Sequence, residues 1–412
     1  MTEQSKKKRP ERAIARHGNV HAAGRVRTIL GILGKALVVV LVSSLTVMGI
    51  SAYQLTQELS RHKINLTTID GKKVEIPPLD GPLNLLLVGS DTREGTDGTF
   101  GSETSNLADV IILIHIAADR KSAVGLSFPR DLMVPWPACP STSGGPGYYA
   151  QELGQINATI ANGGPGCTLL TVEQITGLNI PFLAMVDFNG VIELSNAVGG
   201  VEVCVAEDIN DPYTNTYLKA GMHTLQGLQA LQFLRTRHAV GDGSDLSRIS
   251  NQQVYLTSLV RKLKGKDILN NPVALYSLAQ AAARNMKLSD TLSDPSVMVG
   301  VANALKNIPM KNITFLQLPS IAMTGKYLNR VQPDYEKAQV LFDLLKLDEP
   351  MVLGEVNNTG EGSVVAPTPT PKPTKTPSAK PTPTATPTPT ITPLPDWAQG
   401  TNASTTTCSK GR

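Results

Sequence analysis

The residues best suited to chemistry lie in one stretch, residues 233–253, which reads FLRTRHAVGDGSDLSRISNQQ. Arg235, Arg237 and Arg248 surround a glycine-rich loop that holds Asp242 and Asp245. The planar guanidinium group matches phosphate oxygens through paired hydrogen bonds, so three arginines in a half-apolar segment indicate an anion site. The alternative is a solvated charged loop with arginines at the ends of helices.

A helical interpretation places these side chains relative to one another. Asp245 is a good N-cap, and the helix that follows carries Arg248 in its first turn and Gln252 one turn later. A helix N-terminus favours negative charge because its first N–H groups lack partners. The stretch therefore predicts a phosphate-binding site.

Two aspartates lie at the ends of short apolar runs. Asp91 follows the run at residues 84–90, Asp109 precedes the run at residues 110–117, and Arg130 follows a third run. Such runs are typical of strands buried on both faces. If the strands are neighbours, both carboxylates and an arginine meet at one sheet edge, where they could hold Mg²⁺. The alternative is that each Asp caps its own turn.

Together these segments resemble the LytR–CpsA–Psr family of cell-envelope proteins. The resemblance covers roughly residues 83–347 and runs in order through NLLLVGSDTR, ADVIILIHI, VGLSFPRD, INATIANGG, TVEQITGL, FLAMVDFNGVIELSNAVGGVEVCV and GMHTLQGLQALQFLRTRHAVGDGSDLSRISNQQ. It implies a phosphotransferase that moves a glycopolymer from a polyprenyl-diphosphate carrier to peptidoglycan, leaving a phosphodiester link. Two other functions stay open: a non-catalytic envelope regulator, known as a transcriptional attenuator, and a pyrophosphatase that uses water as acceptor.

The resemblance also implies roles for individual residues. It makes Asp91 and Asp109 the Mg²⁺ ligands. The residues it implies for binding the diphosphate are Arg93, Arg130, Arg235, Arg237, Arg248 and Gln252. The catalytic residues would be Arg130, Asp242 and Asp245. Two positions depart from the family pattern, because Leu107 and Asn251 stand where many members have Arg.

The lipid part of such a substrate needs an apolar slot. The expected helices over residues 254–263 and 169–175 both offer apolar faces, although ordinary core packing explains them equally well.

The N-terminal region predicts a membrane anchor. Residues 1–28 hold eight basic residues against two acidic ones, and the apolar segment at residues 29–52 is long enough to cross a bilayer. Positive charge before the span predicts a cytoplasmic N-terminus and an extracellular remainder. A cleaved signal peptide is the rival interpretation. The short basic end has no helix-turn-helix signature, so we expect no nucleic-acid partner.

The four cysteines, at positions 139, 167, 204 and 408, would face an oxidising compartment. We expect one disulfide, from Cys167 to Cys204, with Cys139 as a competitor for the pairing. The alternative is that these thiols are buried and free.

Strand-like and helix-like segments alternate in the region that resembles the family. They predict an α/β fold in which helices flank a central mixed β-sheet. We expect a membrane-proximal stalk at residues 53–82, the catalytic domain at residues 83–347 and a disordered tail at residues 348–412. The Pro-Thr repeats from residue 366 cannot form a core, and they predict an extended spacer.

Overall fold

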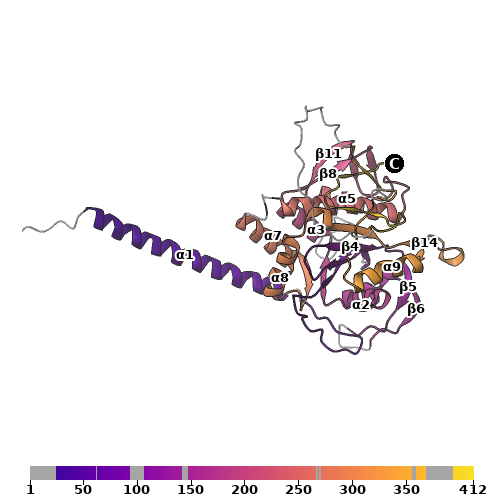
Figure 1. Ribbon diagram of the computed structural model, residues 1–412, viewed down its shortest axis with the longest axis horizontal. Coiled ribbons are helices and arrows are strands. Elements are labelled where there is room, and N and C mark those ends of the chain that lie inside the picture. Colours follow the sequence, from indigo (N-terminus) through magenta and orange to yellow (C-terminus); the bar gives the residue numbers. More distant parts are fainter. Residues whose placement is uncertain are drawn as a thin grey trace, which may run out of the picture. The chain divides into compact units, whose positions relative to one another are not determined.

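The structure is a computed structural model that describes residues 25–61, 63–92, 106–141, 147–265, 268, 271–354, 359–367 and 393–412. It divides into two compact units, residues 1–54 and 55–412. The first described helix, α1 (Arg25–Arg61), begins in the first unit and ends in the second (Figure 1).

The predicted apolar span at residues 29–52 lies within α1, and the helix continues nine residues beyond it. From Ile29 onward, α1 has an apolar window with a mean hydropathy of 2.2, and that window is not buried. Among the described residues it is the one helix long and apolar enough to cross a membrane.

An eight-stranded sheet forms the centre of the second unit. Its strands, in spatial order, are β1 (Lys63–Ile64), β12 (Met286–Ser289), β7 (Phe182–Val186), β2 (Leu83–Ser90), β3 (Ala108–Ile116), β4 (Ala123–Phe128), β13 (Ile313–Gln317) and β17 (Gly400–Asn402). Parallel and antiparallel pairs both occur, so the predicted mixed sheet is confirmed. The predicted stalk is only partly right, because β1 belongs to this sheet and Leu66 is buried in the core.

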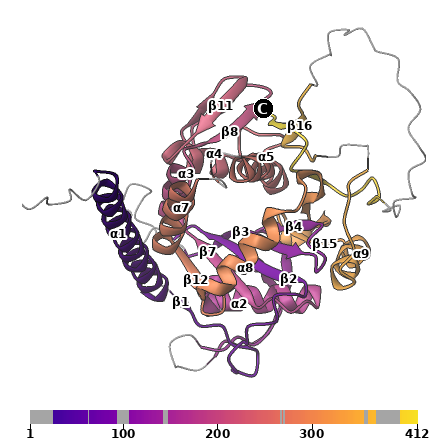
Figure 2. The same ribbon diagram turned by 60° about the vertical axis from the view of Figure 1, so that its left-hand side comes forward.

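Helices cover both faces of the sheet, as predicted (Figure 2). They are α2 (Thr159–Thr176), α3 (Phe188–Ala197), α4 (Leu228–Arg235), α5 (Asp245–Lys264), α7 (Pro272–Asn285), α8 (Pro295–Lys306) and α9 (Tyr335–Lys346). Short 3-10 turns lie at Ile156–Ala158, Met310–Asn312 and Gly325–Tyr327.

Smaller sheets complete the unit. A four-stranded sheet packs against α5 and has the order β11 (Gly221–Leu225), β8 (Val201–Val205), β18 (Thr407–Ser409) and β16 (Ser363–Val365). Three strand pairs are β9 (Ile209–Asp211) with β10 (Thr216–Leu218), β5 (Met133–Trp136) with β6 (Gln151–Gln155), and β14 (Ser320–Ala322) with β15 (Val331–Pro333).

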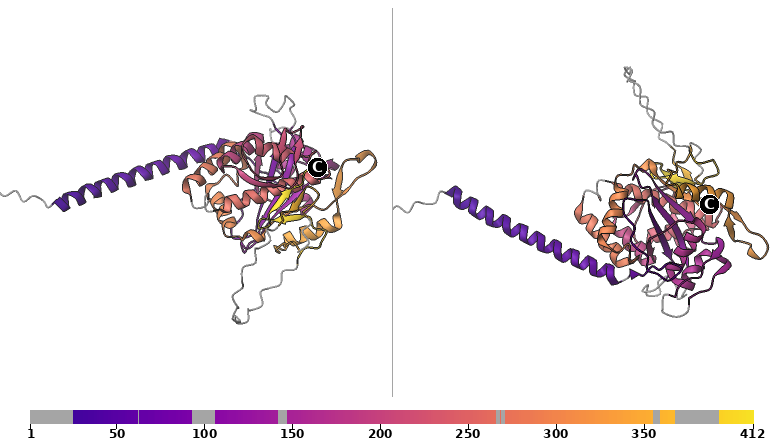
Figure 3. Two further views of the ribbon diagram at one scale, coloured as in Figure 1. Left: turned by 90° about the horizontal axis from the view of Figure 1, so that it is seen from above. Right: turned by 60° about the horizontal axis from the view of Figure 1, so that its bottom comes forward.

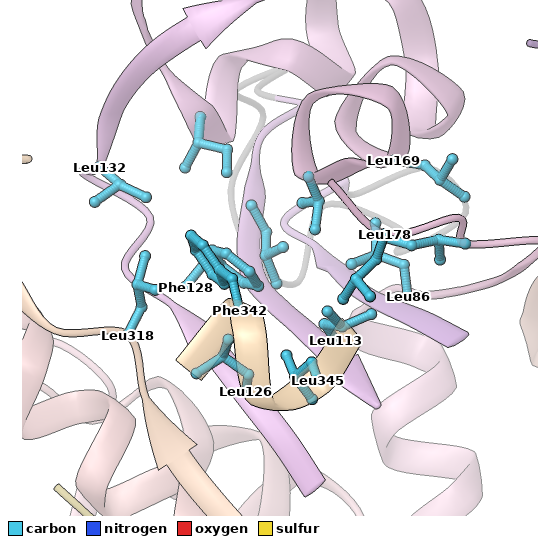
Figure 4. Close-up of a cluster of buried hydrophobic side chains, with 14 of the residues drawn as sticks. Leu86, Leu113, Leu126, Phe128, Leu132, Leu169, Leu178, Leu318, Phe342 and Leu345 are labelled. Carbon is cyan, nitrogen blue, oxygen red and sulfur yellow. The ribbon is translucent and has the colours of Figure 1, made fainter. Parts of the chain in front are cut away.

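One face of the central sheet is tightly packed. Leu86, Leu113 and Leu126 project from three neighbouring strands onto this face, where Phe342 and Leu345 of α9 meet them (Figure 4). Helix α2 closes the same core. Burying each such side chain contributes roughly 1.5–3 kcal/mol of favourable transfer free energy.

The opposite face is filled at one end only. There, residues of α8 pack against Leu83, Ile116 and Phe315 of the sheet. At the other end, where β2 and β3 approach the helices α3, α5 and α7, a cavity remains.

The C-terminal segment corrects one prediction. We expected residues 348–412 to be a disordered tail, but residues 393–412 return to the folded unit and supply β17 and β18 (Figure 3). Residues 368–392, most of the Pro-Thr repeat, lie outside the described residues. Ala366, near the start of the repeat, is bonded to the C-terminal segment, since its N donates to Thr406 O at 2.9 Å.

The expected Cys167–Cys204 disulfide is wrong. Cys139 pairs with Cys167, and Cys204 pairs with Cys408. The second bond joins β8 to β18, two strands that lie side by side in the four-stranded sheet. The sequence pattern gave no reason to choose Cys408, because it follows the Pro-Thr repeat, which was predicted to be an extended spacer.

Candidate active site

The two predicted metal aspartates lie at the ends of neighbouring strands, Asp91 just after β2 and Asp109 near the start of β3. Ser90, the last residue of β2, pairs with Ala108 across a bulge, so Asp91 and Asp109 lie at the same end of two paired strands. Asp91 Oδ1 accepts from Leu107 N at 2.7 Å, and Asp91 N donates to Leu107 O at 3.1 Å. Asp91 therefore also holds the base of the β2–β3 connection, as its turn-capping alternative predicts.

Arg130 connects this edge to the glycine-rich loop. Its Nη1 donates to Asp109 Oδ1 at 2.8 Å, and its backbone N donates to Asp245 Oδ2 at 3.1 Å. Burial opposes the charged form, but the carboxylates of Asp109, Asp245 and Asp131 outweigh it and raise the pKa of Arg130. The guanidinium is therefore a permanent positive charge at the sheet edge.

Helix α5 begins one residue earlier than expected. Its N-cap is Ser244, whose side chain accepts from Ser247 N at 3.2 Å, and Asp245 is the first helical residue. Arg248 Nη2 lies 2.6 Å from Asp245 Oδ1 as an ion pair without hydrogen-bond geometry, and it donates to Asp109 O at 2.9 Å. Arg248 is only 5% exposed, so this stretch is not a solvated loop.

Arg235 and Arg237 leave the end of α4. The guanidinium of Arg235 lies over the ring of Phe188, 4.5 Å from its centroid, which is a cation–π contact. Arg237 Nε donates to Gly243 O at 3.2 Å. Gly243 has a φ of +81°, a conformation that glycine adopts without a Cβ clash, and it lets the loop turn back toward Arg237.

Asp242 is held by its own loop. Burial disfavours its charged form, but hydrogen bonds from Ser244 and Ser247 outweigh burial and lower the pKa of Asp242. The carboxylate is therefore ionised at neutral pH, and its hydrogen bonds with Ser244 and Ser247 shape the turn.

The four arginines and Asp109 line one end of a cavity of about 580 Å³ between the sheet and α3, α4, α5 and α7. The charged and strongly polar residues lining it include Asp109, Arg130, Asp187, Arg235, Arg237, His238, Arg248 and Gln252. The remainder is mainly apolar and includes Leu87, Ile112, Val191, Leu234, Leu256, Leu259, Leu263, Leu278 and Met286. Four arginines and two aspartates line this end, and two of the arginines, Arg130 and Arg248, also pair with Asp245 behind the lining.

The structure brings most of the predicted site together. Arg130, Arg235, Arg237, Arg248, Gln252 and Asp109 all line the cavity. Asp91, Asp242 and Asp245 do not line it, and Arg93 lies outside the described residues. Gln252 Nε2 donates to Leu234 O at 3.1 Å, which fixes its amide at the arginine end.

The two departures from the family pattern have different surroundings. Leu107 N is the donor that Asp91 binds. Asn251 is fully buried, where its Nδ2 donates to Phe233 O at 2.9 Å and its Oδ1 accepts from Ser409 Oγ. Asn251 therefore ties α5 to the C-terminal strand rather than to a phosphate.

Of the two helices predicted to offer an apolar slot for lipid, one lines the cavity and the other does not. Tyr255, Leu256, Leu259 and Leu263 of the predicted helix at residues 254–263 line the cavity. The segment at residues 169–175 belongs to the closed core on the other face of the sheet. The sequence interpretation missed Phe188 and Tyr213, which also line the cavity; an aromatic residue beside an N-cap and one in a short hairpin carry no strong signal.

Within the described ranges, protein side chains alone do not form a closed metal site. Among the residues that the structure describes, no group of three His, Cys, Asp or Glu side chains is arranged to hold a metal ion. Asp109 nevertheless places a carboxylate in the cavity beside Arg130. Mg²⁺ is commonly held by one or two carboxylates together with substrate phosphates, so this donor set fits a cation completed by its substrate.

Comparisons with known proteins agree with this arrangement. The model of the LytR_cpsA_psr family matches residues 49–343. The cell wall biosynthesis protein LcpA of Corynebacterium glutamicum is 31% identical over 275 residues, 60% of this chain and 52% of LcpA, so the match spans about half of that relative. TagT of Bacillus subtilis, named as a polyisoprenyl-teichoic acid–peptidoglycan teichoic acid transferase, is 28% identical over 274 residues, 65% of this chain and 73% of TagT.

A solved structure shares the fold. A LytR-Csp2A-Psr enzyme from Actinomyces oris aligns with a TM-score of 0.50 at 22% identity, covering 69% of this chain and 96% of the solved one.

Proposed function

The chain belongs to the LytR–CpsA–Psr family, and from that premise we propose that it transfers a glycopolymer from a polyprenyl-diphosphate carrier to peptidoglycan. The observation that carries this proposal is the cavity, which joins four arginines to an apolar chamber. A ligand that fits both parts has a diphosphate head and a hydrocarbon tail. The cavity volume of about 580 Å³ lies within the usual range for ligand pockets.

The arginines account for binding and for charge in the transition state. Arg130 and Arg248 are fixed by Asp109 and Asp245 before any substrate arrives. Fixed charges stabilise developing negative charge without reorganising, which is the main source of catalysis in phosphoryl transfer. Asp245 acts on the substrate through the two arginines that it orients.

In the proposed reaction, a hydroxyl oxygen of peptidoglycan attacks the phosphorus that bears the sugar. A phosphodiester bond forms, and the bond to the lipid-side phosphate breaks, so that polyprenyl phosphate leaves. Of the carboxylates that line the cavity, Asp187 caps α3 by accepting from Gly190 N at 2.8 Å. Asp109 lies beside the arginines and binds Arg130 through Oδ1, so its Oδ2 is the oxygen we assign to take the hydroxyl proton; direct catalytic roles for Asp242 and Asp245 stay predictions.

We propose Mg²⁺ as the cofactor, with Asp109 and Asp91 at its site. When bound, it would neutralise charge on the substrate phosphates. Asp109 Oδ1 already binds Arg130, so the aspartate can join the arginine cluster to the cation.

We also propose the location and partners. The apolar helix α1 fits a membrane anchor, and the basic N-terminus predicts that the catalytic domain is extracellular. The lipid bilayer then supplies the carrier-linked polymer, peptidoglycan is the acceptor, and nucleic acid is not a partner.

The test is a transfer assay with full-length protein in detergent, a lipid-diphosphate glycan and soluble peptidoglycan fragments. Arg130→Ala should lower transfer by roughly a hundredfold, since one preorganised charge contact is worth about 3 kcal/mol in the transition state. Arg284→Ala on the exposed side of α7 is the matched control and should leave transfer unchanged. Equal rates in the two variants would reject the arginine site.

The acceptor and the metal are tested in the same assay. Release of glycan phosphate without peptidoglycan at the full rate would identify a pyrophosphatase instead, and lipid binding without any product would identify a non-catalytic regulator. EDTA should stop transfer, and added Mg²⁺ should restore it. Full activity in EDTA would remove the metal from the proposal.

A further inference from the structure

Two aromatic rings lie exposed at the arginine end of the cavity. Tyr213 is 76% exposed, His238 is also exposed, and their ring centroids lie 4.5 Å apart at a tilt of 42°. They are the two exposed residues among the described side chains that line the cavity. They therefore mark the side on which this end of the cavity opens to solvent.

A buried carboxylate anchors the backbone at and beside the residues that carry the two rings. Asp211 is fully buried, its Oδ1 accepts from Tyr213 N at 3.0 Å, and its Oδ2 accepts from Arg237 N at 3.2 Å. Arg237 immediately precedes His238 in the chain. One side chain thus ties the β9–β10 turn to the segment that carries an arginine of the site.

Three hydroxyl groups make a second tie between the same segments. Thr214 contacts Thr216 at 2.8 Å and Thr236 at 3.0 Å, and Thr236 donates to Thr216 at 2.7 Å. Thr216 and Thr236 are buried. Two largely buried hydrogen-bond networks therefore fix the backbone segments that carry these exposed rings. An exposed hairpin held by core packing alone would be less rigidly placed.

The direction of the proposed substrate through the cavity indicates which of its groups would contact these rings. The apolar chamber takes the lipid, the arginines take the diphosphate, and the next group along the molecule must leave toward solvent. That group is the first sugar of the glycan. A pyranose presents a face of C–H groups, whose partial positive charge matches the negative face of an aromatic ring.

We propose that Tyr213 and His238 form a binding subsite for the pyranose ring attached to the diphosphate. The proposal rests on the proposed function and adds the residues that recognise the sugar. The same C–H face exists on the acceptor glycan, and the assignment here is to the donor. Asp211 is a positioning residue that acts through Tyr213 and Arg237.

Two probes separate this subsite from the diphosphate site. Farnesyl diphosphate carries no sugar, and farnesyl diphosphate N-acetylglucosamine carries one. Calorimetry on the full-length protein in detergent should show tighter binding of the sugar-bearing probe. Tyr213→Ala should weaken that probe by about fivefold, the scale of one aromatic contact, and leave farnesyl diphosphate unchanged.

Three further variants control for folding and position. Tyr213→Phe keeps the ring and should bind both probes as the wild type does. Tyr217→Ala removes a ring that is 62% exposed on the same hairpin but lies outside the cavity lining, and it should have no effect. Asp211→Asn removes one anionic acceptor, and it should weaken both probes because it loosens Tyr213 and Arg237 together.

Each remaining outcome has one meaning. Equal binding of the two probes to wild type, or an equal loss of both in Tyr213→Ala, would overturn the sugar subsite and leave the proposed function standing. If Tyr213→Ala binds the sugar-bearing probe as the wild type does but has a raised KM for the peptidoglycan fragment, the subsite binds the acceptor glycan, and its assignment to the donor is overturned. If wild type binds neither probe, the proposed function fails, and the subsite fails with it.

Discussion

The two faces of the central sheet are built from the same strands but are used differently. On one face, Leu86, Leu113 and Leu126 are buried against α2 and α9. On the other, Leu87 and Ile112, their immediate neighbours in sequence, line the cavity. Successive side chains of a strand point to opposite faces, so one apolar run supplies a closed core and a ligand chamber at once.

The difference lies in what covers each face. Helix α9 brings Phe342 and Leu345 onto the closed face. On the open face, α8 fills one end, whereas α3, α5 and α7 leave space over β2 and β3. A fully apolar strand therefore does not identify a ligand site; the packing of the helices over it does.

The largest contrast is expected from matched truncations on the two faces. Leu126→Ala should destabilise the folded state by about 3 kcal/mol, because it opens a void in a close-packed core. Leu87→Ala should cost only about 1 kcal/mol, because one side of that leucine already faces the cavity and less contact is lost. Denaturant unfolding of both variants measures this, and equal losses would contradict the comparison.

A substitution that fills the cavity should separate binding from stability. Ala282→Trp adds bulk among the apolar lining residues, so we expect farnesyl diphosphate to bind about tenfold more weakly, a loss of about 1.4 kcal/mol. The melting temperature should fall little, since the new ring occupies open space. The same change at Ala338, in the closed core, should instead lower the melting temperature strongly. A large melting loss in Ala282→Trp would indicate that the chamber is normally collapsed.

The smallest effect concerns a charge on the closed side. His115 is buried, with Nδ1 2.8 Å from Asn84 Oδ1 and Nε2 2.9 Å from Asp348 Oδ1. Burial lowers the pKa of His115, and it outweighs the opposing effect of Asp348. The folded state therefore resists a proton that the unfolded state accepts near pH 6.5.

The sign of the resulting pH dependence follows directly. The contribution of neutral His115 to the stability of the folded state is complete above about pH 6.5. It is lost as the pH falls from there through the lowered pKa of the folded state. Each tenfold difference in proton affinity between the folded and unfolded states corresponds to about 1.4 kcal/mol. Between about pH 7.5 and 5, the melting temperature should fall less steeply with pH for His115→Gln than for wild type. If the melting temperatures of the two proteins fell in parallel, the pKa of His115 would be the same in the folded and unfolded states.

Local patterns predicted much of this molecule. The strands at Asp91, Asp109 and Arg130 follow from apolar runs bounded by Gly, Asp and Pro, and the cradle of arginines follows from their spacing around the glycine loop. These signals are contained within a few residues, and strands that are close in sequence commonly pair.

The remaining features depend on contacts between distant segments. The pairing of Cys204 with Cys408 spans 204 positions, and β17 adds to the central sheet after the Pro-Thr repeat. The choice between residues 254–263 and 169–175 as the lipid slot depended on which face each helix covers. Tyr213 lies beside the site because Asp211 and the threonine hydroxyls join its hairpin to the segment that carries Arg237.

The Cys204–Cys408 bond has a consequence for handling the protein. It closes the chain into a covalent ring that contains the Pro-Thr repeat, so a single protease cut within the repeat produces no separate fragment. The two pieces would migrate as one band in a denaturing gel without reductant and as two bands with it. Strand β18 would remain bound to β8 by both the disulfide and its sheet contacts. Nicked protein would then keep its site. Without reductant, its mass would differ from that of the intact chain by only one added water.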